Sequence, residues 1–189
     1  MAKLVSSLIT SLDGFAAGPN GELDMFNVGA EFFDFSNTLT DQAGTALYGR
    51  GTFQLMDSYW PNAAQNPDAS KHDIEHSAWY NRVEKIVLST TLKNLNKPNT
   101  RVIDTNLSAQ INKLKQEKEK NIQIFGSPGA VSSLMNENLI DDYWLFVAPV
   151  VLGKGIPLFT NISNRVNLKL VHNKVFRTGM IALHYQPVG

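Results

Sequence analysis

The sequence has no cysteine among its 189 residues. Disulfide bonds, cysteine nucleophiles and zinc sites built from cysteine are therefore excluded. The chain also lacks an excess of either charge, since 17 Lys and Arg residues balance 17 Asp and Glu residues. Proteins that bind nucleic acid usually carry a basic excess. We therefore expect no nucleic-acid partner.

Long hydrophobic runs are also missing. No apolar stretch approaches the roughly 20 residues that a helix needs to cross a bilayer, and residues 4–10 are too few and too rich in serine for a signal peptide. We expect a cytoplasmic protein with no membrane partner. Hydrophobic residues make up 43% of the chain, which suits a globular core, and no linker or repeat divides it. The expected organisation is a single domain over residues 1–189.

Two common nucleotide-binding motifs are absent. No G-x-G-x-x-G follows the first predicted strand, which argues against a standard Rossmann domain. The phosphate-binding motif G-x-x-x-x-G-K-[ST] is missing as well, because Gly153-Lys154-Gly155 is too short and no Ser or Thr follows it. A P-loop NTPase is therefore excluded.

Short apolar runs alternate with amphipathic segments along the chain. We expect strands at residues 3–11, 45–48, 85–89, 100–104, 121–125, 142–148, 167–176 and 180–186, and helices at residues 30–39, 53–56, 72–81, 107–120 and 130–138. Strands that alternate with helices predict a mainly parallel sheet with right-handed crossovers. The hairpin near the end of the chain adds an antiparallel strand. The expected fold class is α/β.

Glycine joins a strand to a helix at two places. The first turn is Gly49-Arg50-Gly51-Thr52, and the second is Gly126-Ser127-Pro128-Gly129-Ala130. Glycine lets the backbone come close to a ligand, and the start of the following helix attracts phosphate. Both turns lie at the carboxyl edge of the expected sheet, where ligands of open α/β sheets bind. Together they could hold the pyrophosphate of a dinucleotide, and the alternative is that both are ordinary tight turns.

Hydroxyl groups gather at the end of another predicted strand, in Leu88-Ser89-Thr90-Thr91. They could bind the ribose 2′-phosphate of a dinucleotide, with Arg50 as a bidentate partner. A simple Ser/Thr turn is the alternative explanation.

In order and spacing, these segments resemble the dihydrofolate reductase-like superfamily, and within it the C-terminal reductase domain of the bifunctional riboflavin-biosynthesis enzyme. The matching segments run along almost the whole chain. They are Ser11-Leu12-Asp13-Gly14, Gly21-Glu22-Leu23-Asp24, Gly49-Arg50-x-Thr52, Ile86-Val87-Leu88-Ser89, Phe125-Gly126-Ser127, Leu139-Ile140-Asp141-Asp142, and Pro149-x-x-Leu152-Gly153-x-Gly155-x-Pro157-Leu158-Phe159. The chain has neither the cysteines nor the length for the zinc deaminase domain of that enzyme, so we expect a stand-alone member.

The resemblance implies a three-layer fold with a mostly parallel eight-stranded sheet, an antiparallel C-terminal strand and flanking helices. It implies NADPH across the carboxyl edge of the sheet, and hydride transfer to a pterin-like or phosphoribosylaminouracil-like compound. The implied cofactor-binding residues are Gly49, Arg50, Thr52, Ser89, Thr90, Gly126, Ser127, Gly129 and Ala130. Ser127-Pro128 departs from the consecutive glycines of dihydrofolate reductase, and Pro128 has no N–H to donate.

Three carboxylates are candidate proton donors, because a C=N bond accepts hydride faster once it is protonated. Dihydrofolate reductases use a carboxylate on the first helix, and the match here is Glu31. The neighbouring Phe32 and Phe33 would desolvate that carboxylate and raise its pKa. Asp13 and Asp24 lie on the loop that is expected to cover the nicotinamide. The alternatives are a surface glutamate at a helix start and two ordinary turn residues.

Four further residues are candidates for substrate binding. Phe26, Phe53 and Trp60 could form the walls around a flat heterocycle, although aromatic residues more often belong to the core. Lys154 could meet an anionic group of the substrate, and the alternative is a solvated loop lysine.

Two rival functions remain open. The segment from His72 to His76 fits the zinc-protease pattern H-x-x-E-H, but no third ligand is evident, so we expect no metal. The other rival is a non-catalytic protein of the same fold that binds a nucleotide or a pterin. An exposed sheet edge near the C-terminal hairpin makes a homodimer the candidate assembly.

Overall fold

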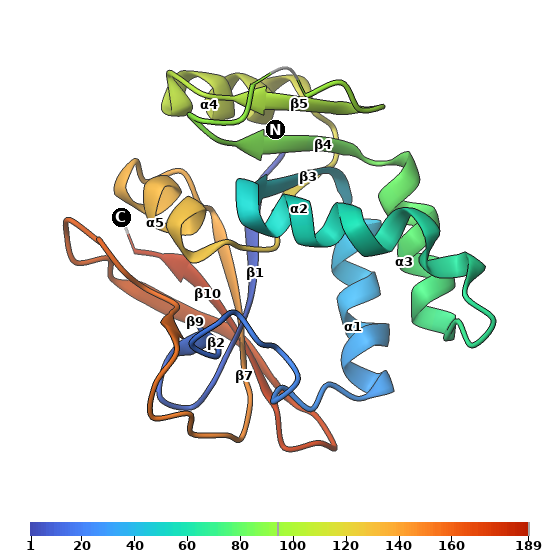
Figure 1. Cartoon of the computed structure of the whole chain (residues 1–189). Coiled ribbons are helices and arrows are strands. Elements are labelled where there is room, and N and C mark those ends of the chain that lie inside the picture. Colours follow the sequence, from blue (N-terminus) through green and yellow to red (C-terminus); the bar gives the residue numbers. More distant parts are fainter. Residues whose placement is uncertain (94, 189) are drawn as a thin grey trace.

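The computed structural model describes residues 1–93 and 95–188. Its centre is an eight-stranded sheet in the order β5-β4-β3-β6-β1-β7-β10-β9 (Figure 1). The strands are β1 (Leu4–Thr10), β3 (Ala43–Gly49), β4 (Glu84–Leu88), β5 (Thr100–Ile103), β6 (Asn121–Ile124), β7 (Asp142–Val147), β9 (Leu168–Val175) and β10 (Ile181–Pro187). The strands from β5 to β7 pair in parallel, and β10 runs antiparallel to both β7 and β9. The predicted α/β fold with a mostly parallel eight-stranded sheet is confirmed.

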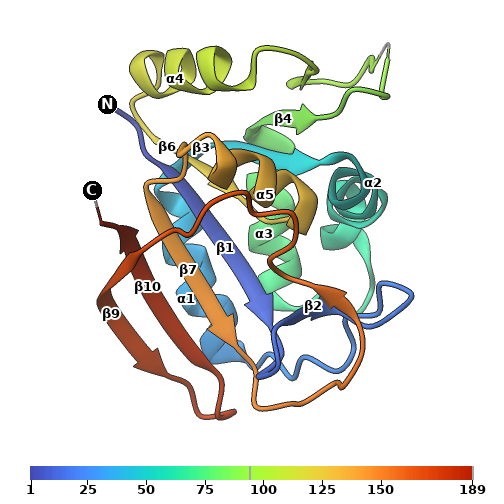
Figure 2. The same cartoon turned by 90° about the vertical axis from the view of Figure 1, so that its left-hand side faces the viewer.

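Helices cover both faces of the sheet and make three layers. They are α1 (Ala30–Asp41), α2 (Arg50–Tyr59), α3 (Lys71–Arg82), α4 (Leu107–Glu117) and α5 (Pro128–Asn136). In Figure 2, α5 lies in front of the sheet, and α1 and α3 lie behind it. The strands contribute core side chains to both faces of the sheet, because successive side chains of a strand point to opposite sides. Leu47 packs with the cluster under α4 and α5, and its neighbour Tyr48 packs with α3.

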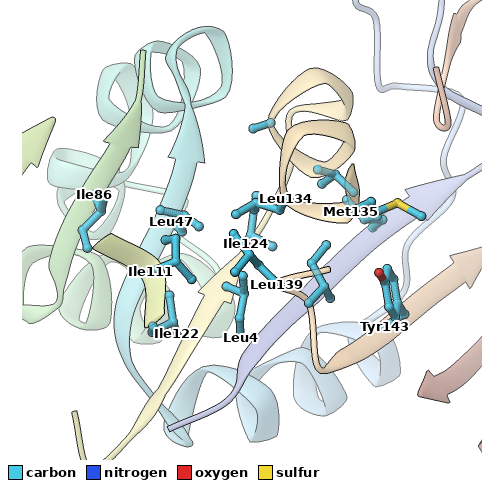
Figure 3. Close-up of a cluster of buried hydrophobic side chains, with 14 of the residues drawn as sticks. Leu4, Leu47, Ile86, Ile111, Ile122, Ile124, Leu134, Met135, Leu139 and Tyr143 are labelled. Atoms are coloured by element: carbon cyan, nitrogen blue, oxygen red, sulfur yellow. The ribbon is translucent and has the colours of Figure 1, made fainter. Parts of the chain in front are cut away.

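The largest core cluster lies between the sheet and helices α4 and α5. Figure 3 shows strand residues such as Leu4, Leu47 and Ile124 in one cluster with Leu134 of α5. All four side chains are fully buried. Two further clusters fill the other face, one under α1 and one under α3. With aliphatic side chains on both faces, these central strands are typical of a covered parallel sheet.

Helix α3 begins at a capping box. The Ser70 hydroxyl accepts a 3.1 Å hydrogen bond from the backbone N–H of Asp73, and the Asp73 carboxylate accepts from the backbone N–H of Ser70 at 2.9 Å. This box satisfies N–H groups that have no partner within the helix. It also fixes which face of α3 turns toward the sheet, and His76, Trp79 and Tyr80 are buried on that face.

Two features differ from the sequence prediction. The sequence predicts a short helix at residues 53–56, but α2 continues to Tyr59 and a 3-10 helix, η1 (Trp60–Gln65), follows it. Strands β2 (Phe15–Ala17) and β8 (Ile156–Pro157) pair in a small second sheet. The sequence did not predict it, because strands of 3 and 2 residues are too short to show a hydrophobic period. Within residues 1–93 and 95–188, no helix is long and apolar enough to cross a membrane.

Candidate active site

Two neighbouring cavities open at the carboxyl edge of the sheet. The first has a volume of about 610 Å³ and lies over the ends of β3, β4 and β5. The second has a volume of about 520 Å³ and lies between α1, α2, α3 and the start of α5. Gly51 and Ser127 line both cavities, so a single extended ligand could pass from one to the other.

The first cavity brings together most of the residues that the sequence predicted for the cofactor. These are Gly49, Arg50, Ser89, Thr90, Ser127, Gly129 and Ala130. The other two predicted residues, Thr52 and Gly126, line the second cavity. The grouping follows from the fold, because each segment begins where a parallel strand ends and these ends share one edge of the sheet.

Hydrogen bonds orient the polar groups of the first cavity. Arg50 Nη1 donates to Thr91 Oγ1 at 2.8 Å, and Ser89 Oγ accepts from the backbone N–H of Leu92 at 2.9 Å. The sequence prediction missed Thr91 as a partner of Arg50, although it directly follows the predicted Ser89-Thr90 pair.

One acidic residue also lines the first cavity. Asp104 follows β5, and its Oδ2 lies 3.1 Å from Lys93 Nζ. The hydrogen bond and charge of Lys93 lower the pKa of Asp104. The sequence prediction missed Asp104, because nothing in the sequence indicates that β5 ends beside the Ser89 turn.

The two glycine turns approach each other very closely. The backbone N–H of Gly49 lies 3.4 Å from the carbonyl oxygen of Gly126. A Cβ atom at Gly49 would overlap Ser127 Oγ and would lie 3.2 Å from Ala130 Cβ. Gly126 has a φ of +100°, a conformation that favours glycine. Both glycines are therefore required by the backbone geometry of the site.

Pro128 takes the place of a glycine without disturbing the start of α5. Ser127 is the N-cap of this helix, and Pro128 occupies the first helical position. Proline is well tolerated there, because N–H groups of the first turn have no partner within the helix. The departure from consecutive glycines therefore leaves the start of α5 intact.

The second cavity is mainly apolar. Phe33 of α1, Trp60 of η1 and Phe125 after β6 contribute aromatic surface to it. Trp60 is thus found where the sequence prediction expected a wall. Thr52 and Gly126, from the two glycine turns, also line this cavity.

Three residues that the sequence proposes for substrate binding lie outside both cavities. Phe26 is 6% exposed in the core under α1, and Phe53 is 2% exposed in the core with Tyr48 and Trp79. Both rings therefore stabilise the fold, as aromatic residues usually do. Lys154 is exposed on its loop and lines neither cavity.

Glu31 does not enter either cavity. Its Oε1 lies 3.1 Å from Lys174 Nζ, and its Oε2 accepts a 3.0 Å hydrogen bond from the backbone N–H of Arg177. These contacts lower the pKa of Glu31, with the Arg177 N–H as the largest cause. The expectation of a raised pKa is wrong, because Glu31 faces the C-terminal hairpin while the next residues, Phe32 and Phe33, face the cavity.

The two candidate aspartates also lie outside the cavities. Asp13 binds the backbone of Leu152 and Gly153, and its pKa is lowered to about 2 by the Ser11 hydroxyl and by these N–H groups. Asp24 is exposed on its loop. Asp13 lacks the apolar surroundings that raise the pKa of a proton donor.

Two histidines line the second cavity, and the sequence prediction considered them only as zinc ligands. The His72 ring stacks on Phe33 with centroids 4.0 Å apart, and the His76 ring lies 4.2 Å from that of Trp60. Burial lowers the pKa of both histidines, that of His76 to about 3. Across the described residues, no three His, Cys, Asp or Glu side chains group together as a metal site. The i, i+4 spacing that suggested zinc instead places both rings on the cavity face of α3.

The comparisons with known proteins agree with this architecture. The family model of the RibD C-terminal domain matches residues 2–182. The uncharacterized protein YyaP of Bacillus subtilis (strain 168) is 34% identical over 187 residues, which are 97% of this chain and 94% of YyaP.

Two solved structures share the fold. RibD of Acinetobacter baumannii has a TM-score of 0.70 and 20% identity, and the match covers 100% of this chain and 59% of RibD. Dihydrofolate reductase of Enterococcus faecalis, complexed with NADP(H) and RAB-propyl, has a TM-score of 0.66 and 16% identity over 98% of this chain and 96% of the reductase. Since the family model spans nearly the whole sequence, the chain belongs to the RibD C-terminal domain family.

Proposed function

We propose that the protein is an NADPH-dependent reductase that transfers hydride to a small heterocyclic substrate. The cofactor occupies the first cavity and the substrate the second. The observation that carries this proposal is the continuity of the two spaces. A cavity lined by an arginine and several hydroxyl groups joins an apolar, aromatic cavity at Gly51 and Ser127.

The residues of the first cavity fit the phosphates of a dinucleotide. Gly49 and Gly126 allow the two turns to approach closely. The first N–H groups of α2 and α5 have no carbonyl partner within their helix, so they are free to donate hydrogen bonds to a phosphate. Arg50 and the hydroxyls of Ser89 and Thr90 suit a 2′-phosphate, because guanidinium binds phosphate in a bidentate way. Lys93 offsets the negative charge of Asp104 in this cavity.

In this reaction the protein mainly orients the substrate and excludes water from it, and does not supply an acidic side chain. NADPH supplies the hydride when it is bound. The apolar walls around Trp60 and Phe33 shield the reacting end of the substrate from solvent and hold its plane. Among the described residues no carboxylate lines the second cavity, and we propose that water delivers the proton that accompanies the hydride.

The substrates that we consider are pterin-like and phosphoribosylaminouracil-like compounds, reduced in the cytoplasm.

We also propose that the chain forms a homodimer through β9. This strand lies at the edge of the sheet, and its Val171 and Val175 are 48% and 65% exposed. Unpaired edges with apolar side chains favour strand pairing. Light scattering coupled to size exclusion should give twice the chain mass, and a monomer would contradict the assembly.

The first experiment is a thermal-shift titration with NADPH and NADH in parallel. A ligand at 100 times its dissociation constant adds roughly 2.7 kcal/mol to the free energy of unfolding. We expect a clear shift with NADPH and a smaller one with NADH at equal concentration. Absorbance of NADPH is then followed with each heterocycle. No shift with either dinucleotide would contradict the cofactor assignment.

A second candidate function is binding without catalysis. It is favoured by the environment of Glu31, Asp13 and Asp24, since none of these carboxylates enters the second cavity. Tight binding of NADPH with no oxidation across pterins and aminopyrimidines would support it. Turnover of any of these compounds would exclude it.

A further inference from the structure

The lining of the second cavity carries no formal charge. It contains aromatic and aliphatic side chains, a few hydroxyls and two histidines, and within the described part of the chain no Asp, Glu, Lys or Arg belongs to it. Arg50 and Asp104 line the first cavity but not the second. An anion that entered the second cavity would therefore lose its water without gaining a cationic partner.

Aromatic rings give the cavity flat surfaces. The rings of Phe33 and His72 stack with an interplanar angle of 18°. The ring of Trp60 lies beside those of both His72 and His76, at centroid distances of 5.4 Å and 4.2 Å. Surfaces of this kind favour planar ligands, because flat rings stack on them with extensive contact.

The two histidines have unused hydrogen-bonding capacity. The Nδ1 atoms of His72 and His76 are buried and have no hydrogen-bond partner among the described residues, so a ligand in the cavity would meet the Nε2 edge of each ring. His76 is only 8% exposed. A neutral imidazole has one donor and one acceptor nitrogen, so the rings can offer polar contacts without a charge.

On the basis of the proposed reductase function, we infer that the second cavity selects an uncharged, planar heterocycle and rejects phosphorylated or carboxylated ones, with His72 and His76 as its neutral polar contacts. A phosphate group is bound in proteins by arginine, lysine or helix N-termini. Arg50 lines the other cavity, and the starts of α2 and α5, which border both cavities at Gly51 and Ser127, hold the dinucleotide phosphates in the proposed function. The inference therefore favours a pterin-like substrate over a phosphoribosylated one.

The test is equilibrium dialysis of matched ligand pairs against the NADPH-saturated protein. The pairs are pterin with carboxypterin, and quinoline with quinaldic acid. In each pair the ring system is kept and one carboxylate is added. We expect the uncharged member to bind at least about tenfold more tightly, which corresponds to about 1.4 kcal/mol. Equal or tighter binding of the carboxylated members would overturn the inference, and so would absence of binding by both uncharged members.

A charge-swap variant tests the physical cause. Ser36 of α1 lines the second cavity, and Ser36→Lys adds a cation there, while Ser36→Met adds similar bulk without charge. We expect Ser36→Lys to bring the carboxylated ligands to within about twofold of the uncharged ones, and Ser36→Met to leave the preference unchanged. If Ser36→Lys retains its fold by circular dichroism but keeps the original preference, the electrostatic explanation is wrong.

The histidine contacts are tested with His72→Phe, which keeps the ring but removes both nitrogens. Pterin affinity should fall by about fivefold, the effect of one neutral hydrogen bond. Ile74→Phe is the control, because Ile74 is 51% exposed on the same helix and lies outside the cavity. Unchanged pterin affinity in His72→Phe would remove that histidine from the site.

Failure of this inference is distinguishable from failure of the proposed function. NADPH binding is measured separately by thermal shift, and the ligand pairs are also dialysed without NADPH. Loss of the NADPH shift with a retained preference for uncharged ligands would contradict the reductase alone. Normal NADPH binding with no such preference would contradict the selectivity alone.

Discussion

Asp13 Oδ2 accepts a 2.8 Å hydrogen bond from the backbone N–H of Gly153, which lies 140 residues later in the chain. Asp13 Oδ1 accepts from the N–H of Leu152 at 3.1 Å and from the Ser11 hydroxyl at 2.7 Å. The carboxylate thus joins the loop after β1 to the loop before β8, next to the paired strands β2 and β8. Asp13 holds these two loops together.

Replacing Asp13 should lower thermal stability without touching the cavity lining. We expect Asp13→Ala to lower the Tm at neutral pH, because three hydrogen bonds to the carboxylate are lost. The pKa of Asp13 is about 2 in the folded protein against 3.8 ordinarily, so its stabilisation is present above pH 3.8 and disappears as the pH falls toward 2. The difference in Tm between wild type and variant should therefore shrink over that range. Asp24→Ala, an exposed site on the loop after β2, is the control and should leave the Tm unchanged.

Removing Arg50 should separate the two dinucleotides. Arg50→Ala is expected to weaken NADPH binding by about ten- to a hundredfold, since hydrogen bonds to charged groups contribute about 1.5–3 kcal/mol. NADH lacks the 2′-phosphate, so its affinity should change little. Isothermal titration calorimetry measures both, and Arg165→Ala, at an exposed loop position, is the control. Equal losses for NADPH and NADH would argue against a 2′-phosphate at Arg50.

An alanine at Gly49 should damage the site through a steric clash. Its Cβ would overlap the Ser127 hydroxyl, so we expect a lower Tm and weaker NADPH binding. The double variant Gly49→Ala, Ser127→Gly removes the overlapping atoms and should recover part of the Tm. Gly51→Ala is the matched control, because a Cβ there meets nothing within 4 Å. No recovery in the double variant would show that another contact is responsible.

Glu31 should be dispensable for reduction. Its carboxylate binds Lys174 and the Arg177 backbone on the hairpin side of α1, away from both cavities. We expect Glu31→Gln to keep kcat and KM within about twofold of wild type. Trp60→Ala, which removes a wall of the second cavity, should raise KM under the same conditions. A large fall in kcat for Glu31→Gln would restore this residue as a proton donor.

Stability should fall in mild acid because of His76. Burial lowers its pKa from 6.5 to about 3, so between these values the unfolded chain binds a proton that the folded protein does not. Stability contributed in this way is full above pH 6.5 and falls as the pH drops, by up to roughly 1.4 kcal/mol per pH unit. His76→Phe keeps a ring in the core and should flatten this dependence. Urea unfolding between pH 7 and pH 5 measures it, and equal slopes for wild type and variant would contradict the prediction.

The sequence was sufficient to predict that the residues directly following the parallel strands would lie together. Gly49, Arg50, Ser89 and Ser127 follow directly after parallel strands, and the ends of such strands meet at one edge of the sheet. Their grouping was therefore predictable once the alternation of strands and helices was recognised. Their role in binding NADPH and the single-domain organisation over residues 1–189 remain predictions.

The direction of each side chain from a helix was harder to predict. Glu31 and Phe33 are two residues apart on α1, yet Glu31 turns to the C-terminal hairpin and Phe33 lines the second cavity. Phe53 and Trp60 looked alike as aromatic candidates, but the first is buried in the core and the second lines the cavity. A rotation of about 100° per residue separates such neighbours on a helix, and only the packed neighbours decide which face is which.

The sequence by itself determined the order of the eight main-sheet strands and the five α-helices, the two glycine turns and the membership of a reductase-like family, because these depend on local backbone preferences and on motifs in a fixed order. The tertiary structure alone decided which polar residues meet. In the folded chain, Asp13 and Glu31 bind backbone N–H groups that are distant in sequence. His72 and His76 point into a cavity whose lining carries no formal charge. The physical reason is that contacts between residues far apart in the chain arise from side-chain packing, on which local sequence preferences have little influence.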